Sequence, residues 1–399
     1  MFRFLLIFFL LYGGIHGYAF WKIKSAFSPG PTLSILMIVI MAVMILAPAG
    51  VRIAEQNGLE ATARALSLVG YTWMGGLFLF LSASLLLDFS RLILFLAEWI
   101  WNKEIFASLM PSPRQALLIP LILALGIYVY GWFEARNIRV QALTIKTEKL
   151  LPEAGPLRLV QISDVHVGLM IGSDFVSRML RVVRDAKPDL LVSTGDLVDG
   201  QINSLEKVLP LLQDIRPRLG KYAITGNHEF YAGISEAQKF ARKAGFVLLR
   251  GEGVTVAGLI NIAGIDDPAG RAIGQHRPVV EAELLKNLPE QHFTILLKHQ
   301  PIVNRNALGL FDLQLSGHTH KGQIFPFSLI TRFYFPLHTG FFRLSDSSCL
   351  HVSRGTGTWG PPIRFFAPPE VTVIDLVPAG VLPRESLGGS RVHFSSGKD

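Results

Sequence analysis

Four long apolar stretches in the first third of the chain constrain its fold more than any other feature. They cover residues 4–20, 32–51, 66–87 and 115–133, and none of them contains Asp, Glu, Lys or Arg. An apolar stretch of about 17–25 residues is long enough to cross a bilayer. Because backbone polar groups inside lipid must be satisfied within the segment, each stretch is expected to be a helix. We therefore predict an all-α transmembrane region of about four helices within residues 1–140.

Two parts of this region have alternative interpretations. The first stretch follows Arg3 as in a signal peptide, but no small-residue cleavage site follows it, and Phe20-Trp21 is typical of an aromatic anchor at the interface. We interpret this stretch as a retained helix. Residues 91–101 are apolar but short and contain Glu98, so we expect them to lie at the interface or against the bundle. If they span the bilayer, the parity of the spans changes.

The basic residues near the spans favour one orientation in a multi-pass cell-membrane protein. An even number of spans puts the start of the chain and everything after residue 134 on the same side. Lys and Arg are enriched on the cytoplasmic side of membrane proteins, which here favours a cytoplasmic C-terminal domain. The basic residues on that side are Arg3, Arg52, Arg64, Arg136, Arg139, Lys146 and Lys149, against Lys22, Lys24, Arg91, Lys103 and Arg114 on the other.

Composition supports a membrane part joined to a globular part. Of 399 residues, 50% are hydrophobic and only 17% are charged, which is too apolar for an ordinary soluble enzyme. The net charge of +8 suits a domain near anionic head groups. No basic run with interleaved aromatic residues is present, so no nucleic-acid partner is expected. Cys349 is the single cysteine, which excludes an intrachain disulfide and Cys-based zinc sites.

From about residue 157 the pattern changes to alternating strands and helices. Leu157–Ser163 is an expected strand, residues 174–187 form an amphipathic helix, and Leu190–Thr194 is the next strand, so this unit is a parallel βαβ. Ser235 and Gln238 suggest a capping box for a helix that ends at Gly245. Further predicted elements are a helix at 205–215 and strands at 221–225, 259–263, 293–298, 312–315, 350–353 and 371–377. Residues 379–399 are rich in Gly, Ser and Pro, which predicts a disordered tail.

Residues of metal-binding type follow five of the predicted strands. In an open α/β sheet, ligands bind beyond the carboxyl ends of the strands, so these residues are expected to converge. In extended chain, residues i and i+2 point to the same side, which lets Asp164 and His166 hold one ion. Glycines at 195, 226 and 317 allow the backbone to turn sharply beside the ligand. The residues are Asp164, His166, Asp196, Asn227, His228, His299, His318 and His320.

The mixture of residue types indicates which ions could bind. Carboxylates, an amide and imidazoles together suit Mn, Fe or Zn rather than Ca or Mg. Even seven of these eight residues are too many ligands for one tetrahedral ion and suit two ions that share a carboxylate. Each residue alone has a structural explanation: Asp196 as a turn former, Asn227 as a left-handed turn residue and His299 as a buried histidine. Their occurrence at five independent strand ends favours the metal site. Asp266-Asp267 is explained by a turn before Pro268, and a role at the rim of the pocket is the alternative.

The motifs resemble those of the calcineurin-like metallophosphoesterase superfamily, in its membrane-associated bacterial phosphodiesterase branch. The resemblance covers residues 157–377. Lys321 is one departure, because that branch commonly has glycine there. The motifs are ISDVHVG, STGDLVDG, ITGNHEFY, GIDD, LLKHQP, LSGHTHKGQIFP and SRGTGTW, the last followed by PP and Arg364.

The resemblance implies a fold and a role for each of these residues. The fold is an α/β sandwich of two mixed sheets flanked by helices, assigned to residues 150–378. The nucleophile is a hydroxide held between two divalent ions, and His228 beside the phosphate stabilises charge and donates a proton to the leaving oxygen. The first ion is held by Asp164, His166 and His320, the second by Asn227, His299 and His318, and Asp196 bridges both.

The expected activity is hydrolysis of a phosphodiester, phosphomonoester or pyrophosphate by a membrane-anchored phosphohydrolase. A domain tethered beside a bilayer works where lipids are concentrated, so a phospholipid or lipid-linked pyrophosphate is a reasonable substrate. Arg354 could contact a phosphate or have a structural role. Two alternatives are a catalytically silent metal-binding membrane module and a transporter with an accessory domain. Aromatic residues that could form a lipid-facing rim, or pack in the core, are Phe325, Phe327, Trp359, Phe365 and Phe366.

Overall fold

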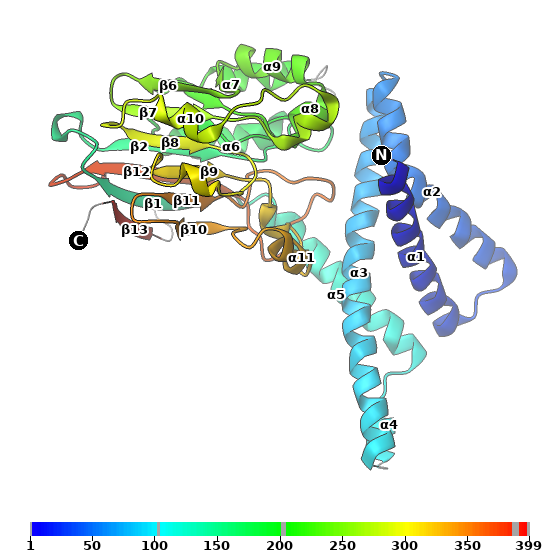
Figure 1. Cartoon of the computed structure of the whole chain (residues 1–399). Helices are drawn as coiled ribbons and strands as arrows, with labels where there is room; N and C mark the ends of the chain where they lie inside the picture. Colours follow the sequence, from blue (N-terminus) through cyan, green and yellow to red (C-terminus); the bar gives the residue numbers. More distant parts are fainter. Residues whose placement is uncertain (1, 102–103, 201–204, 385–390, 397–399) are drawn as a thin grey trace. The chain divides into compact units, whose positions relative to one another are not determined.

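The computed structural model of the chain describes residues 2–101, 104–200, 205–384 and 391–396. The contacts divide it into two units (Figure 1). The first, which we call the helical unit, comprises Met1–Phe133 and Gly360–Ile363. The second, the α/β unit, comprises Glu134–Trp359 and Arg364–Asp399, so it begins earlier than the predicted boundary at residue 150.

The helical unit contains the four long apolar helices that the sequence predicts. They are long and apolar enough to cross a membrane. Their outward side chains are apolar too: Leu36, Leu86 and Ile122 are exposed, as expected for helices that are hydrophobic all round. The helices are α1 (Phe2–Phe27), α2 (Pro31–Gln56), α3 (Glu60–Trp101) and α5 (Pro113–Glu134), with the short α4 (Glu104–Ser108) before α5.

Residues 91–101 belong to the same helix as the predicted third span. They continue α3 without a break, because no Gly or Pro interrupts residues 77–101. Asp88, which ends the predicted third span, is satisfied inside the unit. Its carboxylate accepts hydrogen bonds from Lys22 Nζ at 2.5 Å and from Tyr18 Oη at 2.6 Å, so the charge does not end the helix.

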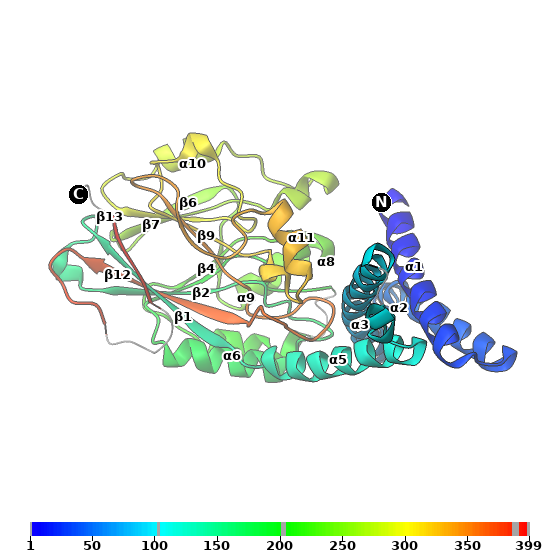
Figure 2. The ribbon, with the colours of Figure 1, turned by 90° about the horizontal axis from the view of Figure 1, so that it is seen from below.

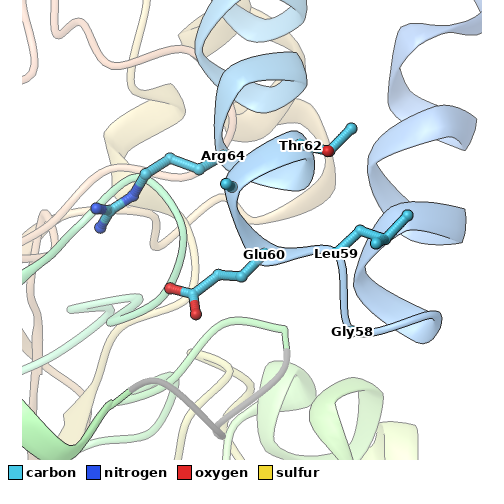
Figure 3. A pocket seen from close by; sticks show the side chains of 6 residues that line it. Gly58, Leu59, Glu60, Thr62 and Arg64 are labelled. Carbon is cyan, nitrogen blue, oxygen red and sulfur yellow. The ribbon is translucent and has the colours of Figure 1, made fainter.

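A depression lies at the turn between α2 and α3 (Figure 3). Its wall consists of a short loop and the first turn of α3, with the Glu60 carboxylate and the Arg64 guanidinium among its polar groups. None of the residues that the sequence singles out for metal binding belongs to it. The lining residues are Gly58, Leu59, Glu60, Ala61, Thr62 and Arg64.

The α/β unit is built on two mixed sheets, as predicted. The first sheet has the strand order β13-β1-β12-β2-β3-β4-β5 and the second has β10-β11-β9-β8-β7-β6. The first comprises β1 (Arg139–Thr147), β2 (Leu157–Ile162), β3 (Leu190–Ser193), β4 (Lys221–Ala223), β5 (Val247–Leu248), β12 (Glu370–Pro378) and β13 (Arg391–Ser396). The second comprises β6 (Glu252–Val256), β7 (Ile260–Gly264), β8 (Phe293–Leu297), β9 (Leu313–Ser316), β10 (Gly340–Arg343) and β11 (Cys349–Val352).

The two sheets pack face to face through apolar side chains from alternate positions of their strands. On β2, Leu157 and Leu159 face the second sheet, where they join Ile295 of β8, while Val160 and Ile162 face the helices outside. This is the period-two alternation of a strand with two buried faces. Helices cover the outer faces, with α6 and α10 on opposite sides of the sandwich in Figure 2. The helices of the α/β unit are α6 (Ser173–Asp185), α7 (Leu209–Gln213), α8 (Asn227–Ala232), α9 (Ile234–Lys243), α10 (Glu281–Lys286) and α11 (Phe327–Tyr334).

Some local predictions agree with the structure and others differ from it. β2 and β3 are parallel, as the predicted βαβ unit requires. The predicted helix at 205–215 is a 3₁₀ turn at Leu205–Lys207 followed by α7. The capping box at Ser235 was wrong, because α9 begins one residue earlier, with Gly233 as its N-cap.

Part of the segment predicted as a disordered tail is a strand. β13 lies parallel to β1, from Ala142↔Arg391 to Thr147↔Ser396. Arg-Val-His-Phe alternates polar and apolar residues, which is a strand pattern that the Gly- and Ser-rich surroundings conceal.

Candidate functional site

The predicted site residues lie in the loops that follow strands of both sheets, all within the α/β unit. The ends of β2, β3 and β4 contribute from the first sheet, and the ends of β8 and β9 contribute from the second. Three groups of side chains result, and we call two of them cluster A and cluster B; the third, His166, Asp196 and His228, shares one residue with each and adds His228. Cluster A contains Asp164, His166 and His320, and cluster B contains Asp196, His299 and His318.

Cluster A brings three buried side chains to one point. One ligand-type atom from each of Asp164, His166 and His320 lies within 4.8 Å of the others. His166 Nε2 is 3.0 Å from His320 Nε2, and His320 Nε2 is 3.5 Å from Asp164 Oδ1. Two imidazole nitrogens and a carboxylate face the same buried point, which suits a divalent cation. With a cation there, no proton is needed between the two rings.

Cluster B has the same character and includes an amide. His299 Nε2 lies 3.2 Å from Asp196 Oδ2 and 3.2 Å from His318 Nδ1. Asn227 Oδ1 is 3.2 Å from His299 Nε2 and 3.0 Å from His318 Nδ1. The amide oxygen therefore faces the same point as the two imidazoles and the carboxylate. All four residues that the sequence placed around a second ion are together here.

Asp196 lies between the clusters. Its Oδ2 atom is 3.2 Å from His299 Nε2 in cluster B and 3.8 Å from His166 Nε2 in cluster A. Its Oδ1 atom accepts a hydrogen bond of 2.8 Å from the backbone N–H of His228. A buried carboxylate needs positive charge or hydrogen bonds on both oxygens. Oδ2 therefore lies within 4 Å of an imidazole nitrogen of each cluster.

The backbone that presents these residues is left-handed, and the extended chain assumed from the sequence was wrong. Asp164 and His166 have φ of 53° and 55°, Asp196 has 51°, and His318 and His320 have 72° and 48°. For residues other than glycine this conformation costs about 1–3 kcal/mol each and is concentrated at functional sites. The side chains at i and i+2 converge because both residues curl the chain, not because a strand continues.

Gly317 shows how closely the two sheets approach at the site. A methyl group on this residue would overlap the Ser163 hydroxyl and the Asp164 carboxylate. The backbone N–H of His318 donates to Asp164 Oδ1 at 2.9 Å, which ties the end of β9 to the end of β2. Only glycine allows this approach, as the sequence predicted for this position.

Further polar groups orient the cluster residues. His299 Nδ1 donates to the carbonyl oxygen of Thr194 at 2.8 Å, so its Nε2 atom faces cluster B. Buried Glu229 accepts backbone hydrogen bonds from Gly226 at 2.6 Å, Asp196 at 2.9 Å and Leu197 at 2.8 Å. Glu229 thus fixes the loop after β3 against the start of α8. The sequence analysis missed this role, although Glu229 belongs to the quoted GNHE motif.

His228 opens α8 beside both clusters. Its Nδ1 atom is 2.8 Å from Asp199 Oδ1, and its ring lies 4.6 Å from that of His166. Burial disfavours the imidazolium, but the carboxylates of Asp196 and Asp199 outweigh burial and raise the pKa of His228 to about 9. A protonated imidazole here can stabilise negative charge and donate a proton. Asp199 was missed, although its spacing of three from Asp196 in GDLVD could have indicated it.

The buried pair Asp196 and His299 carries opposite charges. Burial favours the neutral form of each, but their mutual attraction holds the pKa of Asp196 well below its usual range. The same attraction raises the pKa of His299 well above its usual value. The imidazolium of His299 therefore balances Asp196 where a cation could otherwise do so.

Arg364, named in the sequence only as the end of a motif, is fully buried behind cluster A. Its Nη2 atom lies 3.1 Å from His320 Nδ1, and its Nη1 atom donates to the carbonyl oxygens of Arg354 at 2.7 Å and Ala367 at 3.0 Å. Burial lowers the pKa of Arg364 to about 9, against the opposing effect of Asp164. Arg364 therefore packs the loop behind His320.

The remaining residues that the sequence singled out have structural contacts. Arg354 pairs with Glu370 at 2.5 Å, which supports the structural interpretation. Asp266 pairs with Arg250 at 2.7 Å, and Asp267 accepts from the N–H of Ala269 at 2.8 Å as the cap of a 3₁₀ turn that begins at Pro268, so the turn follows Asp267 and does not account for Asp266. Lys321 has φ of 53°, a conformation that glycine adopts freely.

A sandwich of two mixed sheets with a buried histidine and carboxylate site at its strand ends is the architecture of a metal-dependent phosphoesterase. Residues 157–322 match the model of the family described as calcineurin-like phosphoesterase. The chain is 40% identical over 257 residues to an uncharacterized metallophosphoesterase of Aquifex aeolicus, covering 64% of this chain and 98% of that protein. The chain belongs to the calcineurin-like phosphoesterase family. Its site residues thus fit the divalent metals that this family typically binds.

Some relatives also have membrane segments. The chain is 34% identical over 277 residues to the transmembrane protein with metallophosphoesterase domain of Danio rerio, covering 66% of this chain and 63% of that protein. It is 34% identical over 277 residues to an uncharacterized metallophosphoesterase of Helicobacter pylori, covering 67% of this chain and 74% of the relative. The likeness to the Danio rerio protein and the four apolar helices together indicate membrane association.

Proposed function

We propose that the chain is a multi-pass membrane phosphohydrolase with two divalent ions, Mn, Fe or Zn. Cluster A, formed by Asp164, His166 and His320, holds one ion. His299, His318 and Asn227 hold the other, and Asp196 is shared. The observation that carries the proposal is the position of Asp196 Oδ2, 3.2 Å from His299 Nε2 and 3.8 Å from His166 Nε2.

The chemistry follows from the positions of the side chains. Two divalent ions, when bound, supply an activated water and neutralise phosphate charge. Asp196 and the ligands of both clusters orient the phosphorus centre, and buried walls exclude bulk water. The His228 imidazolium, fixed by Asp199, donates its proton from Nε2 to the leaving oxygen. The basic residues near the spans support a cytoplasmic position for this domain.

The substrate class is a phosphodiester, phosphomonoester or pyrophosphate, and a lipid is the substrate favoured by the membrane helices. The test is turnover by the purified full chain with Mn²⁺ on bis(p-nitrophenyl) phosphate, p-nitrophenyl phosphate and inorganic pyrophosphate, together with metal analysis. We expect hydrolysis of at least one of these and about two ions per chain.

Metal without turnover on any of the three esters would instead support the catalytically silent metal-binding module. If the purified chain has no bound metal and hydrolyses none of the three esters, both proposals are contradicted. The transporter with an accessory domain is disfavoured by the complete set of site residues in the α/β unit.

A further inference from the structure

Helix α11 has its large apolar side chains on the outside. Phe333 is 81% exposed, Tyr334 72% and Leu329 62%, whereas Thr331 is only 8% exposed. The Thr331 hydroxyl is satisfied within the helix, because it donates to the carbonyl oxygen of Phe327 at 3.3 Å. A surface helix of a soluble domain buries its apolar face and exposes its polar one. The orientation of α11 is the reverse, which suits an apolar environment on its outer side.

Neighbouring loops extend this exposed surface. Phe325 and Phe366 lie with ring centroids 5.8 Å apart, and both are exposed. Trp359 is also exposed. The side-chain amide of Gln323 holds its backbone, because Nε2 donates to the Trp359 carbonyl and Oε1 accepts from the Trp359 N–H. Contiguous apolar surface of this kind marks an interaction site. We call the set the apolar rim: Phe325, Leu329, Phe333, Tyr334, Trp359 and Phe366.

The apolar rim lies beside the site, through Trp359 and through the residue that follows α11. Phe335, the residue after α11, lies with its ring centroid 5.2 Å from that of His318 in cluster B. The ring of Trp359 lies 5.8 Å from that of His228. A molecule with an apolar part on the rim therefore has its polar part next to the site.

The charge of this region identifies the partner. Residues 313–345 contain no Asp or Glu but do contain Lys321, Arg332 and Arg343, and Arg332 is exposed on α11 itself. Aromatic and aliphatic side chains mixed with cations are typical of helices that lie in the interface of an anionic bilayer. A protein partner that covered an apolar rim would not require this absence of acidic residues.

The connection between the membrane-type helices and the α/β unit is short. α5 is one of the helices suited to crossing a membrane and ends at Glu134, and β1 of the α/β unit begins at Arg139. Four intervening residues reach at most about 14 Å when fully extended. The start of β1 therefore lies within this distance of the end of α5.

We propose that the apolar rim inserts into the head-group region of an anionic leaflet and that a lipid of this leaflet presents its phosphoester to clusters A and B. The insertion stands on the exposed side chains and charges alone. The presentation of the ester rests on the proposed phosphoesterase function. Two experiments separate these parts.

The first experiment measures insertion. The full chain carrying Phe333→Cys is labelled with an environment-sensitive fluorophore and placed in nanodiscs of phosphatidylglycerol and phosphatidylethanolamine with a nitroxide on the acyl chains. Cys349 is buried, which limits labelling to the new thiol. The control is Lys286→Cys on α10, which contacts β6, the edge strand opposite β10 in the second sheet.

We expect a blue-shifted emission and strong quenching for Phe333→Cys and neither for Lys286→Cys. Equal, weak quenching at both positions would overturn the insertion. Loss of the difference when phosphatidylglycerol is replaced by phosphatidylcholine supports the role of the basic residues, whereas an unchanged difference overturns the preference for anionic lipid.

The second experiment measures presentation of the ester. The double variant Leu329→Ser/Phe333→Ser is compared with the wild type on fluorescent phosphatidylglycerol in vesicles and on soluble bis(p-nitrophenyl) phosphate. We expect at least a tenfold lower rate on the lipid and an unchanged rate on the soluble ester. The matched control is Val280→Ser, an equally exposed apolar residue outside the rim, which should change neither rate.

Equal losses on both esters, or no loss on the lipid, would overturn the presentation. A wild type that hydrolyses only the soluble ester would do the same and leave the phosphoesterase function intact. A wild type that hydrolyses neither contradicts the phosphoesterase function, while the quenching result still decides whether the rim inserts.

Discussion

The two sheets of the α/β unit contribute different chemistry to the site. The loops of the first sheet supply both carboxylates, the amide and the imidazoles of His166 and His228, whereas the loops of the second supply imidazoles only. Neither sheet supplies cluster A or cluster B alone, because A combines the ends of β2 and β9, and B combines the ends of β3, β8 and β9; only the group of His166, Asp196 and His228 comes from one sheet. The site therefore exists only when the sheets are packed, and the apolar layer between them is a condition for metal binding as well as for stability.

Asp196 is the first-sheet carboxylate that both clusters share, so its substitution should affect the site most. We expect Asp196→Asn to lower kcat/KM on a soluble phosphodiester by about 10⁴-fold, the scale of losing a unit of catalytic machinery. Bound metal should fall at both clusters because the neutral amide no longer offsets two cations. The matched control is Asp185→Asn on the exposed end of α6, which should change neither quantity. Full metal content in Asp196→Asn would contradict the shared role.

Imidazoles of the second sheet should separate the two clusters. His320→Ala opens cluster A and His318→Ala opens cluster B, so each variant should keep about one of the two proposed ions. Because Asp196 remains, the loss of metal should be smaller than in Asp196→Asn. Metal content of the purified variants measures this. If either variant loses both ions, the two sites are not independent and the assignment of one imidazole to each cluster is wrong.

His228 belongs to the first sheet's side of the site but to neither proposed ion. His228→Ala should lower kcat by about 10²–10⁴-fold, the range for loss of a general acid, while metal content stays unchanged. A substrate with a good leaving group such as p-nitrophenolate should lose less than an alkyl ester, because its departure needs less protonation. An equal loss on both substrates, or a loss of metal, would show that His228 acts otherwise.

The same comparison explains what the sequence could predict. β2, β3, β8 and β9 are short apolar runs followed by polar residues, so both their positions and the residues at their ends were predicted to within about a residue. β1 was missed because Arg139–Thr147 mixes polar and apolar residues, and its identity as a strand depends on pairing with β12 more than 200 residues later. No local pattern carries that information.

The details of the site were less predictable than its membership. The sequence identified the residues that meet, but it implied extended chain where Asp164 and His166 are left-handed. It did not identify Glu229 or Arg364 as supports, because their partners are backbone atoms and a ring nitrogen that only the fold brings close. Likewise, a helical pattern in a sequence does not say which face of the helix is buried. In α11 Thr331 is buried and the apolar residues face outward.

Asp199 should produce the smallest change, because it acts on the reaction only through His228. Its carboxylate raises the pKa of His228, which stands at about 9, so the imidazolium is present below that pH and lost above it. Asp199→Asn removes one of the raising contacts, so the pKa falls and the basic limb of the pH–kcat profile moves to lower pH. The rate at pH 7 should change only a few-fold as long as the pKa remains above 7, and the rate at pH 9 should fall further. A uniform loss at every pH with an unmoved limb would mean that Asp199 only supports the loop, and the limb would then have to be assigned to a group other than His228.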